Sequence, residues 1–452
     1  MNLCHQTINF NMPLKNLIVK ESTFMAPRKY WGEIKDPVYG YVYITEDERR
    51  IIDSYPFQRL RRLRQLAGAE YVYPGANHTR FEHSVGVMHL ARLLTGNPQL
   101  SEVLSEDDAQ MVRVAALLHD VGHGPFSHIF EHLLVKFMGK THEDMTVWVI
   151  ENSELNDVIS GLGYDPKTVS KLAVGSLNKS GKAFLDQVIS SGVDVDKLDF
   201  IVRDTHHTGA KYGYVDIFRI IETMDLIGEN LAVDIGSLSA LESFMLARIE
   251  SFKSIYFHRV GRAVQIMLAM AMEKAKDELG LVEFSSVDDY LALDDYTMWG
   301  MLKGCKESRE ILRRLERRRL IKCAYETPPF YIKEKIVSSI FNVEGIRTEI
   351  RDQIAEEADV DPELVIIDVP TLPSVPYRHS ILMEPMEIPI IQKTRDGRKI
   401  PRRLTEVSGI FEVLRGFMNI LRVYTEEEHL KEVQVAAEKL FGNLPSTMRI
   451  SY

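Results

Sequence analysis

The sequence predicts a mainly α-helical protein with a smaller C-terminal region of mixed α and β structure. Three observations indicate this: apolar residues recur at helical spacing from Ile51, helix-capping patterns precede several of these runs, and short β-rich segments gather after about residue 280. At 452 residues and 45% hydrophobic content, the chain can form two or three domains with a sizeable core. We expect an irregular leader at 1–30, a helical domain at 31–280 and an α+β region at 281–452.

The individual elements are predicted from turns, caps and periodicity. A Pro/Gly turn before the β-rich run Tyr41–Thr45 predicts a hairpin. Thr79 with Glu82, and Ser105 with Asp108, form helix-start patterns, so a helix is expected to begin at each. Further helices are expected at Asp194–Asp204, Ile217–Leu226, Leu238–Leu279 and Val407–Val423. Strands are expected at Leu364–Val369, Ser380–Met383 and Ile388–Gln392.

Composition and charge restrict the class of protein. The sequence has no run of about 18 apolar residues and no secretory leader, which predicts a cytoplasmic protein with no membrane segment. Cys4, Cys305 and Cys323 are too few and too scattered for a disulfide framework or a thiolate metal site. A formal net charge of −10 argues against a surface built mainly for nucleic acid.

The stretch LLHDVGHGPFSH carries an unusual concentration of histidine directly behind an apolar run. His119 and Asp120 are consecutive and can reach one ion at the end of their helix, and His123 lies one turn further on, on the face of His119. His83 comes from a second helix, and the segment Asp194–Asp204 offers a further carboxylate. Imidazole and carboxylate are ligands that borderline divalent metals accept, so the cluster predicts a metal site.

Five ordered blocks carry a family resemblance: FQRLRRLRQL, YPGANHTRFEHSVGV, LLHDVGHGPFSH, DVDKLDFIVRD and IYFHRVGR. They resemble the HD superfamily of metal-dependent phosphohydrolases, and in particular the deoxynucleoside triphosphate (dNTP) triphosphohydrolases. The resemblance is strong over 31–280, which we interpret as the HD phosphohydrolase domain, and it extends more weakly into VPYRHSILMEP. It implies hydrolysis of a dNTP to a deoxynucleoside and inorganic tripolyphosphate.

The resemblance also implies which residues hold the metal. The implied ligands are His83, His119, Asp120 and Asp196. Two carboxylates neutralise a divalent ion, but they do not fix its identity: iron, manganese, nickel, cobalt and magnesium all accept such a site, whereas structural zinc is disfavoured. Asp196 could instead be a helix-capping residue, in which case Asp194 is the alternative ligand.

A second set of residues is expected to move protons. His128 is the candidate acid for the departing alkoxide, and Glu131, three residues later on the same helical face, can orient and charge its imidazole. Family members commonly have aspartate at the position of Glu131. His142 and Glu143 resemble another active-site pair, with a solvated helix start as the less favoured explanation, and His123 completes the candidate catalytic set.

Substrate contacts follow from the resemblance. Arg80 and Lys197 match positions that contact phosphate, a role that suits cationic side chains. Positions matching sugar, base and deoxyribose contacts are Asp204, Tyr256, Gln65 and Leu66. Phe200 replaces the tyrosine usual in this block, and Phe257 replaces a glutamine, which puts base and sugar preference in doubt but not the hydrolysis.

The block IIDSYPFQRLRRL resembles the segment through which family members bind a regulatory nucleotide. Asp53, Gln58 and Arg61 are the candidate residues, with GTP or a dNTP as the candidate effector. Such regulation implies a homo-oligomer, most simply a tetramer. A surface helix with ordinary charges is the alternative explanation of this block.

Two other functions remain open at this stage. An enzyme of the same superfamily acting on nucleoside monophosphates or cyclic nucleotides would keep the metal ligands but would have little need of Arg80 and Lys197 together. A nucleic-acid-binding protein is suggested by the arginines of FQRLRRLRQL and by the run Arg313–Arg319, which we expect to end a helix. Charge runs on helices are usually solvated faces, so this role is the less favoured.

Overall fold

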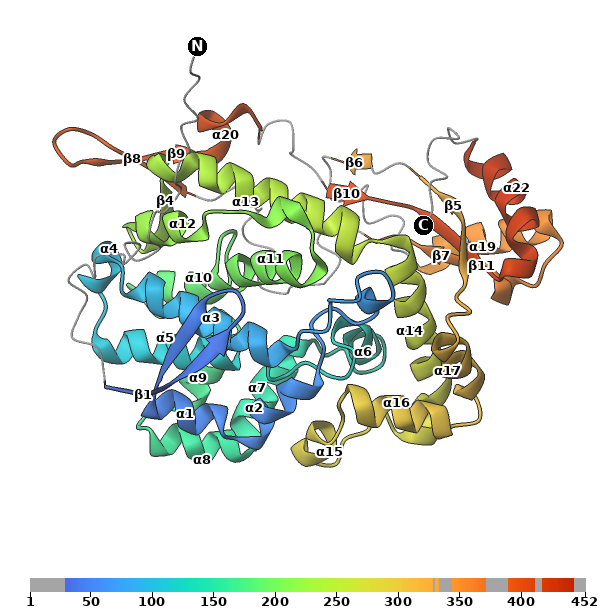
Figure 1. The fold of residues 1–452 in the computed structure, drawn as a ribbon, viewed down its shortest axis with the longest axis horizontal. Coiled ribbons are helices and arrows are strands. Elements are labelled where there is room, and N and C mark those ends of the chain that lie inside the picture. The colour runs from blue at the N-terminus through green and yellow to red at the C-terminus, as the bar shows by residue number, and fades with distance from the viewer. Residues whose placement is uncertain (1–28, 328–329, 333–343, 371–388, 411–416, 443–452) are drawn as a thin grey trace, which may run out of the picture.

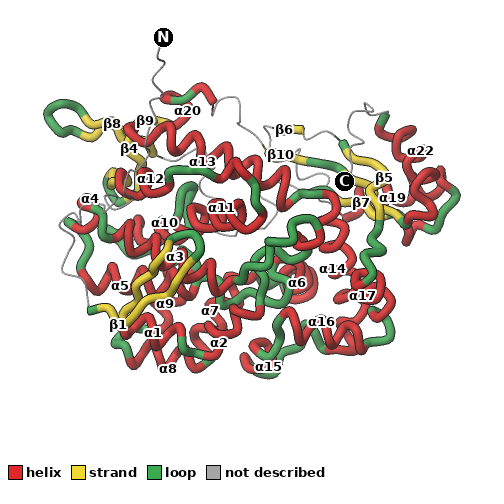
Figure 2. The backbone as a smooth tube through the Cα atoms, in the orientation of Figure 1, coloured by secondary structure: helices red, strands yellow, loops and turns green. Residues whose placement is uncertain are grey.

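Helices form most of the computed structural model, which describes residues 29–327, 330–332, 344–370, 389–410 and 417–442 (Figure 1). The predicted class, mainly helical with a C-terminal region that contains strands, is confirmed. Figure 2 shows most of the strands in two places, at the upper left and at the right of the helical body, and an N-terminal pair in front of the helices.

Three helices at the centre position the candidate site. They are α3 (Arg80–Thr95), α5 (Glu106–Leu118) and α11 (Val195–Thr208), and α3 packs against both of the others. The predicted helix starts are confirmed: Thr79 and Glu82 form a capping box before α3, and the Ser105 side chain accepts a hydrogen bond from the amide of Asp108 in α5. Local capping chemistry therefore fixes where the central helices begin.

The remaining helices surround this centre. Before residue 200 they are α1 (Glu46–Ile52), α2 (Tyr55–Arg59), α4 (Pro98–Ser101), α6 (His128–Leu133), α7 (His142–Asn152), α8 (Glu154–Gly161), α9 (Pro166–Ala173) and α10 (Phe184–Ile189). After it come α12 (Ile217–Thr223), α13 (Leu238–Ser251), α14 (Arg259–Leu279), α15 (Val287–Leu291), α16 (Asp295–Gly304), α17 (Arg309–Glu316), α19 (Glu344–Ala358), α20 (Leu404–Val407) and α22 (Leu430–Phe441). Among the described residues, no helix is long and apolar enough to cross a membrane.

Four small sheets complete the described structure. The predicted N-terminal hairpin is confirmed as β1 (Tyr30–Asp36) and β2 (Gly40–Thr45), which are antiparallel. The other strands are β3 (Met224–Ile227), β4 (Asn230–Asp234), β5 (Lys322–Glu326), β6 (Phe330–Ile332), β7 (Ile366–Asp368), β8 (Pro389–Lys393), β9 (Lys399–Arg403), β10 (Phe417–Asn419) and β11 (Arg422–Thr425). They form the sheets β3-β4-β8-β9, β5-β11-β7 and β10-β6, in which only the β4–β8 pair is parallel.

Three predicted helices are wrong in part. The helix expected at Ile217–Leu226 ends at Thr223, because the next residues pair with β4. The run Leu238–Leu279 is two helices, separated where His258 adopts extended backbone and caps α14. The segment expected as a helix at Val407–Val423 ends in β10 and β11, because Val423 is buried between β5 and β7 and sheet packing overrides helical periodicity.

The strands expected near the C-terminus are confirmed in part. Strand β7 falls within the predicted Leu364–Val369, and β8 covers most of the predicted Ile388–Gln392. The strand expected at Ser380–Met383 lies outside the described residues. The run Arg313–Arg319 ends a helix as expected, since α17 stops at Glu316.

The hydrophobic core extends across most of the chain. One cluster of buried residues runs from Val42 in β2, through the central helices, to Ile390 in β8 and Tyr424 in β11. A smaller core lies where α19 and α22 pack against β5, β7 and β11. The C-terminal segment therefore contributes to both cores, and β8 joins a sheet whose first two strands precede residue 240.

Candidate active site

The four predicted metal ligands lie together. His83 comes from α3, His119 and Asp120 follow α5, and Asp196 lies in the first turn of α11. Nε2 of His83 lies 3.2 Å from Nε2 of His119 and 3.0 Å from Oδ1 of Asp196. Asp120 approaches the same point, with one oxygen 3.7 Å from Nε2 of His83 and the other 3.4 Å from Nε2 of His119.

The donor set is suited to a divalent metal. Nδ1 of His83 bonds to Oδ2 of Asp199 at 2.8 Å, and Nδ1 of His119 bonds to the carbonyl oxygen of Ala116 at 2.8 Å. Each ring therefore donates from Nδ1 and turns Nε2, the nitrogen that would bind metal, toward the common point, as in metal-binding histidines. Burial raises the pKa of Asp196, but hydrogen bonds from His119 and His83 outweigh it and hold that pKa well below its usual value. Asp196 is thus a carboxylate, the form that binds metal.

The neighbouring Asp194 has a different position. Its buried carboxylate caps α11, accepting hydrogen bonds from the amides of Lys197 at 2.7 Å and Ser191 at 2.8 Å. It also pairs with Nζ of Lys197 at 2.6 Å. The structure therefore places Asp194 at the helix cap and Asp196 among the histidines, and Lys197, a candidate phosphate contact, lies against the cap.

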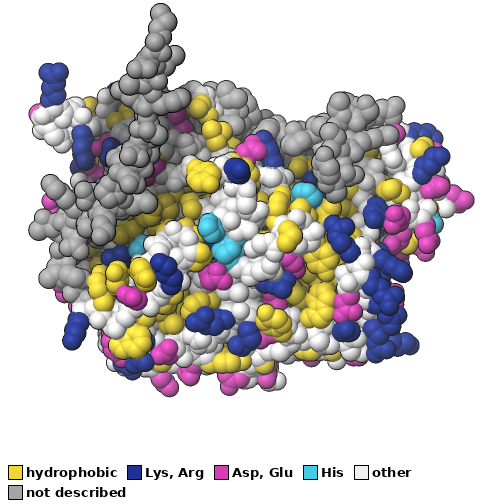
Figure 3. Space-filling model, viewed as in Figure 1, with side chains coloured by type: hydrophobic (Ala, Val, Ile, Leu, Met, Phe, Trp, Pro, Cys, Tyr) yellow, Lys and Arg dark blue, Asp and Glu magenta, His cyan; other side chains and the backbone are white. Residues whose placement is uncertain are grey.

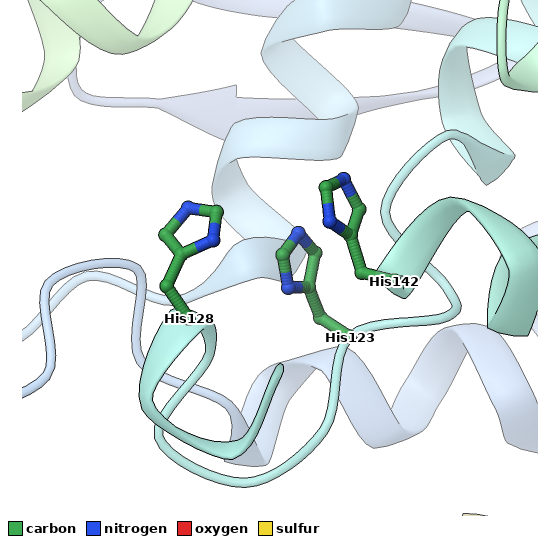
Figure 4. Close-up of side chains that lie close together, drawn as sticks. All are labelled: His123, His128 and His142. Atoms are coloured by element: carbon green, nitrogen blue, oxygen red, sulfur yellow. The ribbon is translucent and has the colours of Figure 1, made fainter. Parts of the chain in front are cut away.

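Three more histidines converge beside this cluster, and Figure 4 shows their rings turned toward one another. His123 lies in the loop after α5, His128 begins α6 and His142 begins α7. The carboxylate of Glu131 bridges two of them, at 2.9 Å from Nδ1 of His128 and 2.6 Å from Nδ1 of His142. The ring of His142 also stacks on that of His123 at 4.1 Å. Glu143, the next residue of α7, is half-buried.

Burial and charge give these groups different protonation preferences. Burial raises the pKa of Glu131, but the charge of His142 and hydrogen bonds from both neighbouring histidines outweigh it and hold that pKa far below its usual value. Burial lowers the pKa of His142, but the Glu131 carboxylate more than offsets this and raises it. Burial and the charge of Arg80 lower the pKa of His123. The arrangement thus holds a charged His142–Glu131 pair against a neutral imidazole.

Arg80 and Asp120 join the two clusters. Nη1 of Arg80 lies 2.5 Å from Oδ2 of Asp120, and Nε donates to Oγ of Ser127 at 2.7 Å. The other oxygen of Asp120 lies 3.4 Å from Nε2 of His123. Nη2 of Arg80 is buried and has no hydrogen-bond partner among the described residues, so one donor remains for an anion. A cation therefore lies beside both the candidate ligands and the candidate catalytic set.

The predicted sugar and base contacts form a separate group. The carboxylate of Asp204 accepts a hydrogen bond from the hydroxyl of Tyr256 at 2.6 Å and contacts Nε2 of His78 at 2.8 Å. Phe200 packs edge-on against Tyr256, with ring centroids 6.2 Å apart. The backbone N–H of Gln65 donates to the backbone carbonyl of His78 at 3.1 Å, and the next residue, Leu66, is half-buried.

Several residues of this site were not among those predicted from the sequence. They are His78, Asp199, Ser127 and His207, whose ring stacks on that of His78 at 4.4 Å. Asp199 could have been noticed, since it lies one helical turn after Asp196 in the same block. No local sequence signal distinguishes Ser127 or His207.

The candidate regulatory residues lie directly after α1 (Asp53), on α2 (Gln58) and just after α2 (Arg61). Nε of Arg61 donates to Oε1 of Gln58 at 2.9 Å, and the guanidinium lies over the ring of Phe81 at 3.5 Å. Asp53 instead pairs with Arg49 at 2.8 Å. The structure therefore brings Gln58 and Arg61 together, and it places Asp53 in a local helix-end ion pair.

Family models match two parts of the chain. The HD domain matches residues 80–184, and the HD associated region matches 215–449. Together with the histidine and aspartate cluster, these matches define the class of protein as a metal-dependent phosphohydrolase of the HD superfamily. The chain belongs to the family whose members combine an HD domain with an HD-associated region.

Individual proteins are similar to this chain over much of its length. The chain is 33% identical to an uncharacterized protein of Methanocaldococcus jannaschii over 64% of its own length, and 31% identical to the human deoxynucleoside triphosphate triphosphohydrolase SAMHD1 over 66%. It spans 58% and 55% of the lengths of those two proteins. A crystal structure of a hypothetical protein from Aquifex aeolicus has 28% identity and a TM-score of 0.72, covering 90% of this chain and 99% of the other.

Proposed function

We propose that the protein hydrolyses deoxynucleoside triphosphates to a deoxynucleoside and inorganic tripolyphosphate. The observation that carries the proposal is the shared position of Asp120, which contacts the candidate ligand His119 with one oxygen and the buried cation Arg80 with the other. The candidate metal ligands therefore lie next to Arg80, the proposed phosphate-binding cation. They also lie next to His123, a member of the proposed catalytic set. The similarity to a human triphosphohydrolase supports the substrate class.

The metal contributes charge, and the chain contributes proton transfer and orientation. A divalent ion held by His83, His119, Asp120 and Asp196 supplies Lewis-acid stabilisation of negative charge on the phosphate. Iron, manganese, nickel, cobalt and magnesium all remain candidates, since the ligand types accept each.

His128 is positioned to act as the general acid. Its Nδ1 is held by Glu131 at 2.9 Å, which orients the ring and leaves Nε2 to protonate the departing 5′ oxygen. The His128 side chain is 45% exposed whereas that of Glu131 is 5% exposed, so the acid can reach a substrate while its partner stays fixed. His123, His142 and Glu143 complete the set around it. Arg80 is proposed to bind a phosphate oxygen through its free Nη2.

The group around Asp204 is proposed to bind the sugar and base. Tyr256 and Phe200 offer aromatic surface, and the backbone of Gln65 bonds to that of His78, which contacts Asp204; Leu66 is the next residue. The Oε1 atom of Gln65 is buried without a hydrogen-bond partner among the described residues, so it is available to a substrate hydroxyl. Lys197 is proposed to contribute to phosphate binding after release from Asp194.

The alternatives are less well supported. A monophosphate or cyclic nucleotide would not require a second cation such as Lys197 beside Arg80. For nucleic acid, Figure 3 shows Lys and Arg side chains gathered along the edge near α17. Arg313 pairs with Glu310 at 2.7 Å, and Arg314 pairs with Glu426 at 2.5 Å, so the charges of these two arginines are compensated within the chain.

The test is product analysis with defined metals. The purified protein is loaded with each candidate metal, incubated with each of the four dNTPs, and its products are separated by chromatography. Deoxynucleoside and tripolyphosphate should appear in equal amounts with the wild type and not with Asp120→Asn. Release of inorganic phosphate alone, or turnover of nucleoside monophosphates but not of dNTPs, would establish the alternative enzyme class.

We further propose that a nucleotide, GTP or a dNTP, regulates the enzyme through a homo-oligomer, most simply a tetramer. Arg61 offers a guanidinium that suits recognition of a phosphate, and it lies beside the amide of Gln58, whose Nε2 donates to the carbonyl of Ile52 at 2.7 Å. An effector can act in this way only by binding the active assembly more tightly than the inactive one.

A further inference from the structure

The turn immediately before His128 has an uncommon backbone conformation. Phe126 has a φ of 55° and Ser127 a φ of 57°, although neither is glycine. Side chains disfavour positive φ, and Ser127, with a ψ of −120°, lies outside even the left-handed helical region, so two such residues in succession must be held by their surroundings. His128 begins α6 directly after them, and its position therefore depends on this turn.

The contacts of Asp295 explain how the turn is held. This residue begins α16, well outside the segment that matches the HD domain, and its side chain is buried. Its Oδ1 atom accepts a hydrogen bond from the amide of Phe126 at 2.7 Å, and Oδ2 accepts one from the amide of Arg64 at 2.9 Å. One carboxylate thus connects two segments that are 62 positions apart in the sequence.

Both connected segments carry site residues. On one side, Oγ of Ser127 accepts from Nε of Arg80 at 2.7 Å and donates to the carbonyl of Arg64 at 2.7 Å. On the other side, Arg64 directly precedes Gln65. Asp295, Ser127 and Arg80 thus give the turn, the proposed phosphate-binding cation and the segment before Gln65 fixed relative positions.

The preceding residue, Asp294, provides a contrast. Its carboxylate caps α16 by accepting from the amides of Tyr296 and Thr297, and it pairs with Arg62 at 2.5 Å. These contacts stabilise the helix start, and none of them involves the turn. Asp294 therefore has contacts only at the helix start and with Arg62, whereas its neighbour Asp295 contacts the turn before His128.

We propose that Asp295 is a positioning residue of the active site: its carboxylate holds the Phe126–Ser127 turn in its positive-φ conformation and so places His128 and Ser127. The HD-associated region thereby completes a site whose candidate metal ligands and acid lie outside it. The kinetic part of the test rests on the proposed dNTP hydrolysis, whereas the structural part does not.

The test compares four variants: Asp295→Ala, Phe126→Gly, the double variant and the control Asp294→Ala. Hydrogen exchange followed by mass spectrometry measures protection of the peptide covering 122–130 in the metal-loaded protein. Asp295→Ala should raise exchange there and lower kcat on the order of 10²-fold, the expected cost of a misplaced catalytic group, with bound metal unchanged. Asp294→Ala should leave the exchange of this peptide as in the wild type.

Glycine at position 126 supplies the decisive readout, because it adopts positive φ without strain. Removal of Asp295 should therefore cost at least several-fold less in kcat in the Phe126→Gly background than in the wild type. Equal costs in the two backgrounds, or wild-type exchange of 122–130 in Asp295→Ala, would overturn the proposal. If Asp295→Ala does not fold, Asp295→Asn, which retains one acceptor oxygen, takes its place with the same criteria. A wild type that hydrolyses no dNTP refutes the proposed function, while the exchange comparison still decides the role of Asp295.

Discussion

His83 and Asp199 share a buried hydrogen bond of 2.8 Å between Nδ1 and Oδ2, although 116 residues separate them in the sequence. Asp199 is itself held by Arg203, with bonds of 2.8 and 3.0 Å, and Arg203 reaches Asp36 at the end of β1 at 2.8 Å. The orientation of one candidate metal ligand is thus fixed by a chain of buried ionic contacts. Such partners determine which nitrogen of a histidine faces the metal.

We predict that Asp199→Asn weakens metal binding about 10- to 100-fold, the usual cost of losing the partner of a metal-binding histidine. The amide removes the negative charge that keeps Nδ1 protonated and Nε2 directed at the metal. Calorimetric titration of the metal-free protein with Mn²⁺ measures the change. Asp157→Asn, at an exposed position on α8, is the control, and equal affinities in the two variants would contradict the assignment.

His128→Ala should retain bound metal but lose turnover on the order of 10²-fold or more, the usual contribution of a general acid. His132→Ala is the matched control, because His132 lies on the same helix and its side chain is 60% exposed. The measurement is kcat with a dNTP beside metal content by mass spectrometry. A loss of only a few-fold in His128→Ala would transfer the role of acid to His142.

The His142–Glu131 pair predicts a pH dependence of stability. The lowered pKa of Glu131 contributes stability that is present above the unfolded value of about 4.3 and is lost as pH falls through the folded value. The raised pKa of His142 contributes stability that is present below the unfolded value of about 6.5 and is lost as pH rises through the folded value. The stabilising contributions of Glu131 and His142 are therefore both fully present only between the two unfolded pKa values, from about pH 4.3 to about pH 6.5.

Glu131→Gln should accordingly destabilise the metal-free protein most at about pH 5.5, inside this window, and less at a pH above the raised folded pKa of His142, where that ring has lost its proton. Denaturant unfolding of the wild type and the variant at both pH values measures the difference in free energy. A destabilisation that is the same at both would show that the pair is not ionic.

The proposed regulation is tested with the variant Arg61→Ala. Arg61 lies outside the proposed catalytic set. Turnover of each dNTP is measured alone and in every pairwise mixture with GTP or another dNTP, with mass determined by light scattering. We expect the wild type to form an oligomer in which one nucleotide stimulates hydrolysis of another, and the variant to lose stimulation but keep basal turnover. Arg313→Ala, an exposed arginine on α17, should behave as the wild type. A monomer whose mixtures never exceed their components would refute the proposal.

Local chemistry made part of the fold predictable. The helix starts at Thr79 and Ser105 depend on side chains within three residues, and the histidine cluster is visible because His119 and Asp120 are adjacent. The choice between Asp194 and Asp196 was open in the sequence, because both lie near the helix start. In the structure, the helix register makes the first the cap and carries the second toward His83.

Contacts between distant segments could not be predicted. The pairing of β4 with β8 joins positions about 157 apart, and nothing in Met224–Ile227 alone distinguishes a strand from a continued helix. The same limit applies to the site, since the roles of Asp199 and Asp295 depend on partners brought close only by folding. Periodicity also misassigned the segment that contains β11, because Val423 and Tyr424 are buried by neighbours on both sides of the strand.

The central claim, that water cleaves the bond between the 5′ oxygen and the α-phosphate, is tested most directly by hydrolysis in ¹⁸O-labelled water. The metal-loaded protein is incubated with a dNTP that it turns over, and the masses of both products are measured by mass spectrometry. Attack at the α-phosphorus with proton transfer to the departing oxygen predicts one ¹⁸O in tripolyphosphate and none in the deoxynucleoside. Label in the deoxynucleoside, or the appearance of deoxynucleoside monophosphate with pyrophosphate, would contradict the account.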